Sequence, residues 1–463
     1  MEVSGIFEAQ RAGVAARRAG FGLAERRAAL DRLRATILAQ RDAIVAAIQS
    51  DFGKAPTETE LSEILPVLQE IAHARRHLRR WMRPRRVWPT LTTFGTSGRV
   101  IAQPRGVCLI IAPWNYPLLL ALGPLVSALA AGNSAVLKPS ELTPATSALI
   151  ARMIGATFPA DLVAVVEGGP EVATDLLALP FDHIFFTGSP AVGRIVMAAA
   201  ARSLASVTLE LGGRSPVIVG TGANVARAAR WIAWGKFLNA GQTCVAPDHV
   251  FVHASLAGPL TEALRSEIAR AYGTDPSLSP DLARIVTPRH WARLRGLIDA
   301  TRDGGAEVVA GGGGDEAARH LAPTLVTGAT HDMALLRDEI FGPILPIIPF
   351  SRPDEPIAAI NAGERPLALY VFGGRELIRR VTAETSSGSV GVNLTVAPFI
   401  HMNLPFGGVG NSGQGAAHGF AGFRAFSHEK PVLANRFSTL PLVFPPYRGR
   451  ARALSRLLLR LFG

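Results

Sequence analysis

The chain has little cysteine: only Cys108 and Cys244 occur among its 463 residues. Two cysteines cannot build the disulfide framework that stabilises many small secreted proteins. The N-terminal sequence MEVSGIFEAQRAG also lacks the apolar core of a signal peptide. We therefore expect a cytoplasmic protein whose thiols stay reduced.

Acidic residues are outnumbered by basic ones, 36 to 48, which gives a net charge of +12. Most of the excess is arginine in two stretches, residues 74–86 and 447–460. A surplus of this kind can serve nucleic-acid binding, but no RNA-recognition or zinc-finger signature accompanies it. We expect no nucleic-acid partner and interpret both stretches as solvated basic faces.

Several motifs that define other enzyme classes are missing. A Walker A loop and a G-x-S-x-G turn are both absent, which counts against P-loop nucleotidases and typical serine hydrolases. His73 and His77 have helical i, i+4 spacing, but arginines and no glutamate stand between them. Because no Cys/His cluster occurs elsewhere either, no metal site is expected.

One long stretch, residues 106–137, lacks charge altogether and exceeds the roughly 20 residues that span a bilayer. Pro113, Asn115, Pro117 and Pro124 interrupt it, however. We predict a buried strand, a loop, a buried helix and a second strand, as a parallel sheet covered on both faces requires. The stretch is interpreted as core and not as a membrane span.

Short apolar runs alternate with segments of helical length through residues 99–211. This alternation predicts an α/β protein with a doubly wound parallel sheet, which binds ligands beyond the carboxyl ends of its strands. Residues up to about Arg80 have mainly helical periodicity. A second α/β pattern begins near residues 215–220, which places a domain boundary at about Gly212.

A strand-to-helix junction at residues 184–204, IFFTGSPAVGRIVMAAAARSL, is a candidate anion site. Ser189 suits a helix N-cap, and Gly188 and Gly193 keep the approach to the helix open. A helix N-terminus of this kind can hold a pyrophosphate. An ordinary strand-to-helix turn would carry the same residues, so the junction alone leaves both interpretations open.

Seven short motifs occur in the order and approximate spacing of the NAD(P)-dependent aldehyde dehydrogenases. They are PWNYP (113–117), LKPSELTP (137–144), FTGSPAVG (186–193), LELGGRSP (209–216), NAGQTC (239–244), EIFGP (339–343) and NLPFGGVGNSG (403–413). The chain resembles this family over roughly residues 5–435. The short N-terminus and GQTCVAPD are most similar to the class 3 branch, which includes fatty, aromatic and coniferyl aldehyde dehydrogenases.

The resemblance implies the aldehyde dehydrogenase fold: a doubly wound, Rossmann-like cofactor domain, a second α/β catalytic domain and a small β oligomerisation arm that pairs two subunits. A homodimer is therefore expected. The implied boundaries are 1–85 and 105–211 for the NAD(P)-binding domain, 212–400 for the catalytic domain, 86–104 and 401–435 for the bridging arm, and 436–463 for a basic amphipathic tail.

The cysteine of the NAGQTC motif is the nucleophile in this family, so the resemblance implies that Cys244 attacks the aldehyde carbon and forms a thiohemiacetal. The chemistry of sulfur favours the same role, because thiolates are strong nucleophiles and water can open a thioester. The alternative is a small buried residue, which is how we interpret Cys108.

Two further residues are implied to act on the same carbon. Asn115 and the backbone N–H of Cys244 would stabilise the oxyanion, although Asn115 could instead be a simple turn residue. Glu210 matches the general base that activates water, and its place at the end of an apolar strand predicts a raised pKa. Arg214 stands where lysine is common after ELGG, a change that keeps the charge.

The cofactor contacts follow from the same motifs. They are Trp114, Lys138, Glu141, Gly188, Ser189, Gly193, Glu339 and Phe341. Glu141 favours a ribose with free hydroxyls, whereas Lys138 would tolerate a 2′-phosphate. NAD is therefore the expected cofactor, and NADP is compatible with the same residues.

The substrate is expected to be a hydrophobic aldehyde, aliphatic or aromatic. The pocket residues that suggest it are Tyr116, Phe237, Phe399 and His418. Two other functions would fit the fold, namely a CoA-acylating aldehyde dehydrogenase and a non-catalytic relative. Glu210 argues for water as the acyl acceptor, and its presence together with Cys244 and Asn115 argues for catalysis.

The C-terminal sequence RARALSRLLLRLFG has the pattern of a basic amphipathic helix. Leucines 454, 457, 458 and 461 share one face, and arginines 452, 456 and 460 share another. Such a helix suits peripheral contact with an anionic membrane, where each arginine adds about 1 kcal/mol. The alternative is a helix that packs on the body or on the partner subunit.

Overall fold

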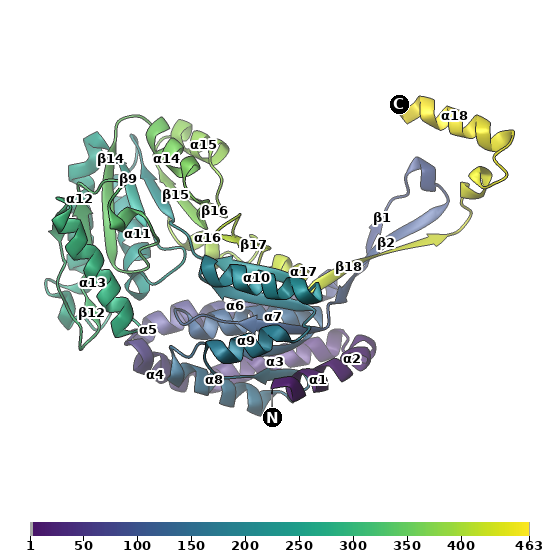
Figure 1. Cartoon of the computed structure of the whole chain (residues 1–463), viewed down its shortest axis with the longest axis horizontal. Helices are drawn as coiled ribbons and strands as arrows, with labels where there is room; N and C mark the ends of the chain where they lie inside the picture. Colours follow the sequence, from purple (N-terminus) through teal and green to yellow (C-terminus); the bar gives the residue numbers. More distant parts are fainter. Residues whose placement is uncertain (1–2, 463) are drawn as a thin grey trace.

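The computed structural model describes residues 3–462 and has two α/β lobes and a β arm, which projects from the first lobe (Figure 1). The chain begins with helices, as their periodicity predicts. They are α1 (Val3–Ala12), α2 (Val14–Gly20), α3 (Leu23–Ala39), α4 (Arg41–Phe52), α5 (Pro56–Thr59) and α6 (Leu65–Trp81), with the π-helical turn η1 (Glu60–Ile64) between the last two.

A six-stranded sheet forms the centre of the first lobe, in the order β17-β7-β6-β3-β4-β5. All its strands are parallel except β17, which runs antiparallel to β7. The strands are β3 (Val107–Ile111), β4 (Ser134–Lys138), β5 (Val163–Val165), β6 (His183–Gly188), β7 (Ser206–Leu211) and β17 (Gly413–Gln414). The order reverses between β3 and β6, which creates a crevice at their carboxyl ends.

Helices cover both faces of this sheet, so the predicted doubly wound arrangement is confirmed. The helices α3, α4, α6, α7 (Pro117–Ala131) and α8 (Pro144–Thr157) lie on one face. The helices α1, α9 (Pro170–Ala178) and α10 (Pro190–Ser203) lie on the other. The uncharged stretch forms β3, α7 and β4 inside this core, and no helix of residues 3–462 is long and apolar enough to cross a membrane.

The second lobe contains a seven-stranded sheet in the order β10-β13-β14-β9-β8-β15-β16. The chain enters it through residues 212–215, between β7 and β8. Its strands are β8 (Pro216–Val219), β9 (His249–His253), β10 (Glu307–Ala310), β13 (Thr324–Thr327), β14 (Ile344–Phe350), β15 (Ala368–Phe372) and β16 (Ser389–Val392). Its principal helices are α11 (Val225–Phe237), α12 (Ala257–Tyr272), α13 (Pro288–Asp303), α14 (Asp354–Ala362) and α15 (Arg375–Glu384).

The arm consists of three antiparallel strands, β1 (Arg85–Val87), β2 (Thr96–Pro104) and β18 (Ser427–Asn435). The predicted arm segment 401–435 is too long. Its first part lies on the first lobe, because β17 completes the edge of the six-stranded sheet and α17 (Gly419–Ala425) packs on α6 and α7.

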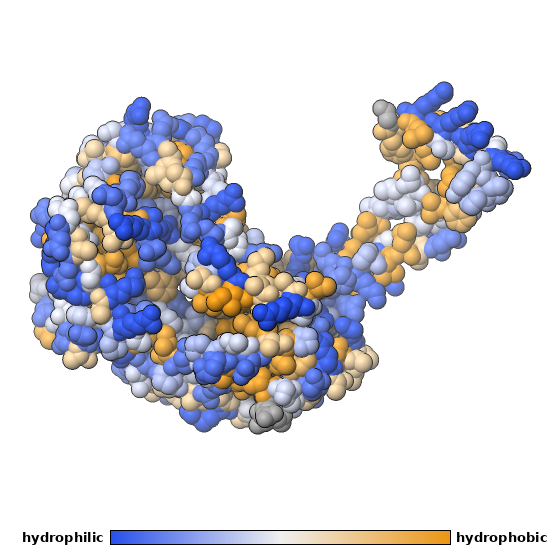
Figure 2. All heavy atoms as spheres, in the orientation of Figure 1, coloured by the Kyte–Doolittle hydropathy of each residue, from blue (hydrophilic) through white to orange (hydrophobic). Residues whose placement is uncertain are grey.

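The tail forms the predicted helix, α18 (Arg450–Phe462), at the far end of the arm and away from both lobes (Figure 1). Hydrophilic and hydrophobic residues lie on different sides of it (Figure 2). Leu457, Leu459 and Leu461 are all exposed. Among residues 3–462 the helix packs on neither lobe, so its apolar side is free for another surface.

Candidate active site

The site is built where the first sheet reverses its order and faces the second lobe. The segment after β3 carries Trp114 and Asn115, the end of β6 carries Gly188 and Ser189, and β7 carries Glu210. These residues are brought together because parallel strands end at the same edge of a sheet.

A cleft of about 290 Å³ lies at this edge. Its lining includes Trp114, Asn115, Thr187, Gly188, Ser189, Glu210, Cys244, His290, Arg293, Glu339 and Phe341. Ser189 caps α10, because its hydroxyl oxygen accepts a 3.4 Å hydrogen bond from the Val192 N–H. The hydroxyl of Thr187 is buried and makes no hydrogen bond within the described chain. A helix N-terminus preceded by a glycine, beside a cleft that contains an unsatisfied hydroxyl group, fits a dinucleotide.

Cys244 follows a strained turn, η3 (Leu238–Gly241), at the end of α11. Asn239 and Ala240 both have a φ of +52°, a conformation that side chains other than glycine rarely adopt. Two hydroxyl groups, one from β15 and one from the residue before β8, hold the backbone after the turn. The Tyr370 hydroxyl donates a 2.6 Å bond to the Val245 carbonyl, and the Ser215 hydroxyl donates a 3.3 Å bond to that of Cys244.

The electrostatics of the cleft keep Cys244 in its thiol form. Burial raises the pKa of the Cys244 thiol to about 12, and the carboxyl groups of Glu339 and Glu210 contribute in the same direction. Burial also raises the pKa of Glu210 well above its ordinary value, as its position at the end of an apolar strand predicts. Neither carboxyl oxygen of Glu210 has a hydrogen-bond partner within residues 3–462, which leaves both for water or a reacting group.

Asn115 is buried beside the thiol, 3% exposed, and its side chain is held in one orientation. One amide hydrogen is donated to the Gln242 carbonyl at 3.0 Å. The Asn239 amide in turn donates to the Asn115 carbonyl at 2.9 Å. Because a side-chain amide has two N–H groups, the second is available to an oxyanion next to Cys244.

Glu339 and Phe341 enter the cleft on either side of a clamped residue, Ile340. The Ile340 N–H donates a 2.9 Å bond to Asp248, and its carbonyl accepts a 2.6 Å bond from Arg293. Burial, followed by the nearby Asp248, raises the pKa of Glu339 to about 8. We name the contacts of Asp248 and Arg293 with Ile340 the Ile340 clamp.

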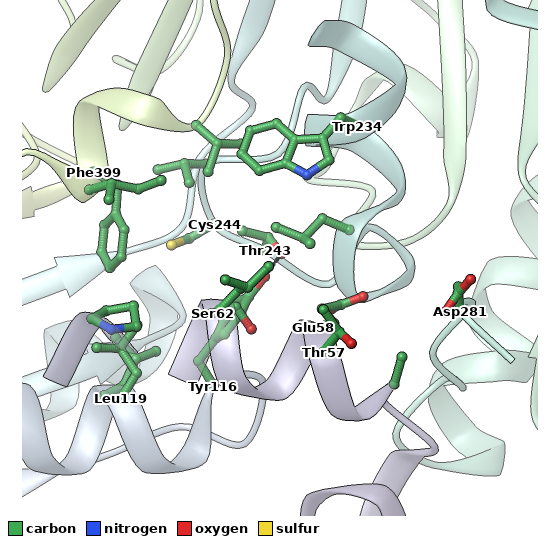
Figure 3. A pocket seen from close by; sticks show the side chains of 18 of the residues that line it. Thr57, Glu58, Ser62, Tyr116, Leu119, Trp234, Thr243, Cys244, Asp281 and Phe399 are labelled. Atoms are coloured by element: carbon green, nitrogen blue, oxygen red, sulfur yellow. Dashed lines mark hydrogen bonds between the residues drawn. The ribbon is translucent and has the colours of Figure 1, made fainter. Parts of the chain in front are cut away.

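A second cavity, of about 340 Å³ and largely apolar, reaches Cys244 from another side (Figure 3). It is lined by Ala55, Thr57, Glu58, Leu61, Ser62, Pro66, Tyr116, Leu119, Leu120, Trp234, Leu238, Thr243, Cys244, Val245, Ala271, Tyr272, Asp281, Val396, Phe399 and Ile400. The predicted pocket residues Tyr116 and Phe399 belong to this wall. The Tyr116 hydroxyl forms a 2.8 Å hydrogen bond with that of Thr243, next to the thiol.

The prediction is wrong for two pocket residues, Phe237 and His418, because neither lines this cavity. Phe237 is 1% exposed and points into the core of the second lobe, where its ring lies 6.4 Å from that of Tyr272. His418 stands behind Phe399, with ring centroids 4.8 Å apart, and its Nδ1 lies 3.6 Å from Glu70. The backbone of His418 has a φ of +66°, and its side chain lies behind the cavity wall and not in the cavity.

The other predicted cofactor residues lie further from Cys244. Lys138 and Glu141 are joined by a 2.8 Å salt bridge at the end of β4 and line neither of the two cavities. Gly193 packs within α10 against β7, where a Cβ atom would lie 2.7 Å from Leu211. The structure therefore places these three beyond the part of the cleft that surrounds the thiol.

The sequence interpretation missed several groups that the structure brings to the site. They are Glu58, Ser62, Trp234, Asp248, Asp281, His290 and Arg293. Asp248 ends the GQTCVAPD motif and could have been considered on that ground. The others come from segments with no motif, so only the fold brings them near Cys244.

Comparison with known proteins agrees with this arrangement. The model of the aldehyde dehydrogenase family matches residues 5–432. The chain is 43% identical to 4,4′-diaponeurosporen-aldehyde dehydrogenase of Staphylococcus aureus, over 92% of each protein. It is 42% identical to a protein of Pseudomonas aeruginosa named probable coniferyl aldehyde dehydrogenase, over 94% of this chain and 90% of that protein.

Solved structures extend the comparison to the whole fold. The substrate-bound state of AldH from Staphylococcus aureus superposes with a TM-score of 0.95 at 40% identity, over 99% of this chain and 100% of that one. AldA of P. syringae, solved with NAD⁺, superposes at 0.85 and 26% identity, over 93% of this chain and 89% of that one. The chain therefore belongs to the aldehyde dehydrogenase family and is an NAD(P)-dependent aldehyde dehydrogenase.

Proposed function

We propose that the enzyme oxidises a hydrophobic aldehyde to its carboxylic acid, with Cys244 as the nucleophile. One observation carries the proposal: Cys244 lines both the cleft at the sheet edge and the apolar cavity. A thiol at this position can meet an aldehyde from one side while the other side receives its hydride. The apolar cavity favours a hydrophobic substrate, because binding there removes the apolar surface of the substrate from water.

The first step forms a bond between Cys244 Sγ and the aldehyde carbon, while the thiol proton passes to water in the cleft and the carbonyl oxygen becomes an oxyanion. The free N–H of Asn115 and the backbone N–H of Cys244 stabilise that charge. Removing one such donor in an acyl-transfer enzyme costs about 3 kcal/mol of transition-state stabilisation. The oxyanion then collapses, a hydride leaves the carbon, and a thioester with Cys244 is left.

NAD(P)⁺, when bound in the cleft, supplies the acceptor for this hydride. Gly188, Ser189, Glu339 and Phe341 are the residues placed to hold it, since they line the cleft with Cys244. Lys138 and Glu141 support the proposal of NAD as the preferred cofactor. Their salt bridge positions a carboxylate to accept hydrogen bonds from free ribose hydroxyls.

Glu210 completes the cycle by removing a proton from water as the water attacks the thioester. The acid is released and the Cys244 thiol is restored. A carboxyl group with a raised pKa is a stronger base once ionised, which suits this step. Hydrolysis through Glu210 distinguishes this function from transfer of the acyl group to CoA.

Product analysis with and without CoA tests the proposal, using the wild type and Glu210→Gln. The wild type should form free acid at a rate that CoA does not change. Glu210→Gln should release one equivalent of NADH rapidly and then turn over about 100- to 10,000-fold more slowly, because general-base assistance is lost. An acyl-CoA product, or normal turnover by the variant, would contradict the mechanism.

We also propose a homodimer formed through the arm and peripheral membrane contact through α18. The arm carries large exposed apolar residues, including Trp88 (91% exposed), Leu433 (60%) and Phe437 (69%), which suit burial against a second subunit. The tail helix combines exposed leucines with arginines, which suits an anionic interface.

A further inference from the structure

The wall of the apolar cavity contains a strip of polar side chains. Thr57, Glu58 and Ser62 supply this strip from α5 and η1, and Asp281 lies beyond Glu58 at the end remote from Cys244 (Figure 3). A π-helical turn is rare and is frequently found at functional sites. A carboxyl group on an apolar wall is costly unless something satisfies it.

Glu58 is satisfied on one side only. Its Oε1 accepts a 2.9 Å hydrogen bond from the backbone N–H of Asn239, at the base of the turn that leads to Cys244. In residues 3–462 no donor reaches its Oε2, which is left to the cavity. The nearby Lys54 ammonium is bonded to Glu63 at 2.7 Å, with both side chains fully buried, so its charge is already compensated.

The charged groups around Glu58 leave it able to ionise near neutrality. Burial raises the pKa of Glu58 to about 7, Lys54 and the Asn239 N–H oppose this, and Glu63 and Asp281 add to it. The hydroxyls of Tyr116 and Tyr272 are further titratable groups on this wall, and burial raises the pKa of both. Glu58 is therefore a charged acceptor above pH 7 and a neutral group below it.

We propose that Glu58 selects aldehydes that carry a hydroxyl group at the end remote from the carbonyl. The aldehyde end reaches Cys244, the apolar body fills the cavity, and the hydroxyl donates a hydrogen bond to the free Oε2 of Glu58. Hydrogen bonds to ionised groups are the strong ones, and a plain alkanal would leave the carboxylate without a partner. This inference rests on the proposed function, because Cys244 must hold the other end of the substrate.

The test compares alkanals with ω-hydroxyalkanals of equal length, over a series of lengths, as the ratio of their kcat/KM values. Above pH 7 the ratio should peak at one chain length, with the hydroxyaldehyde about tenfold better. It should decline as the pH falls through about 7, where Glu58 becomes protonated. A general loss of activity in a variant lowers both kcat/KM values equally, so it does not change their ratio.

Glu58→Gln should lower the ratio several-fold and make it independent of pH, because the variant removes the titrating charge. Its amide oxygen can keep the bond from the Asn239 N–H, so an N–H₂ group faces the cavity and offers the substrate hydroxyl only a neutral hydrogen bond. Glu60→Gln is the matched control, because Glu60 lies on the next turn, pairs with Arg41 and does not line the cavity. Its ratio should equal that of the wild type.

Three results would overturn the inference. A wild-type ratio near one at all lengths would show that no acceptor is used, and a ratio unchanged in Glu58→Gln would place the acceptor elsewhere. Both leave the proposed function intact, because the aldehydes are still oxidised. Failure of the wild type to oxidise either series would overturn the proposed function and this inference with it.

Discussion

At the scale of single residues, chemistry converges on Cys244. It lines both cavities, and burial together with the carboxyl groups of Glu339 and Glu210 raises its pKa. Such shifts occur where a protein prepares a group for proton transfer. The raised pKa of Glu210 suits a base, whereas the Cys244 thiol has to lose its proton as it attacks.

Replacing the thiol tests this assignment. Cys244→Ser should lower aldehyde oxidation at least about a thousandfold, because a hydroxyl is a far weaker nucleophile in this setting. Its affinity for NAD should stay within about twofold of the wild type, since most cofactor contacts lie in the first lobe. Steady-state kinetics and calorimetric titration with NAD measure the two effects. Retained turnover would remove Cys244 from the mechanism.

At the scale of elements, the Ile340 clamp links the strand β9 region to helix α13. Asp248 precedes β9 and Arg293 belongs to α13, so two separate elements fix the one residue between Glu339 and Phe341. The ring of Phe341 lies 5.5 Å from that of Trp114, across the cleft. The clamp thereby sets the width of the cofactor cleft.

Breaking the clamp should weaken cofactor binding more than chemistry. Asp248→Ala removes the acceptor for the Ile340 N–H, and we expect the KM and the Kd for NAD to rise about 10- to 100-fold. Asp248→Asn keeps an oxygen acceptor and should recover most of the loss. Kinetics at saturating NAD measure the effect on chemistry, and calorimetry measures the effect on NAD binding. An equal fall in kcat for both variants would argue against a positioning role.

The sequence predicts the elements well and the walls of the site less well. Alternating apolar runs and helical segments define the doubly wound sheet because burial on both faces leaves a strong pattern. Local motifs identify Cys244, Glu210 and Asn115. Glu58 could not be found in this way, since it meets Asn239 from 181 positions away and no local pattern marks it.

Phe237 shows the opposite error. It lies seven residues before Cys244 in the sequence, yet it faces the far side of α11 and packs on Tyr272. Proximity in sequence gives no side-chain direction at the end of a helix, where the turn that follows decides it. The length of the arm was overestimated for a similar reason, because the short strand β17 has no apolar pattern of its own.

At the scale of the whole molecule, the arm is the feature whose apolar surface a single chain leaves uncovered. It projects from the first lobe (Figure 1), and exposed hydrophobic residues lie along it (Figure 2). We expect a dimer at micromolar concentration in sedimentation velocity. Aspartate at both Trp88 and Phe437 should shift it to monomer, because the new charges would be buried without partners. A wild-type monomer would contradict the proposal.

The tail gives a second prediction at this scale. The full chain should co-sediment with anionic liposomes at low salt, and deletion of residues 447–463 should release it while oxidation of a soluble aldehyde continues. Neutral liposomes are the control for the charge requirement. Equal partitioning of the full-length and shortened chains would show that α18 binds no membrane.

The contrast between the two cysteines has a practical consequence. Burial raises the pKa of both thiols, but Cys108 is completely buried in β3, whereas Cys244 is partly exposed. An alkylating reagent applied to the folded protein should therefore modify one thiol per chain. Mass spectrometry of the labelled protein would then count functional active sites in a preparation, independently of any assay of turnover.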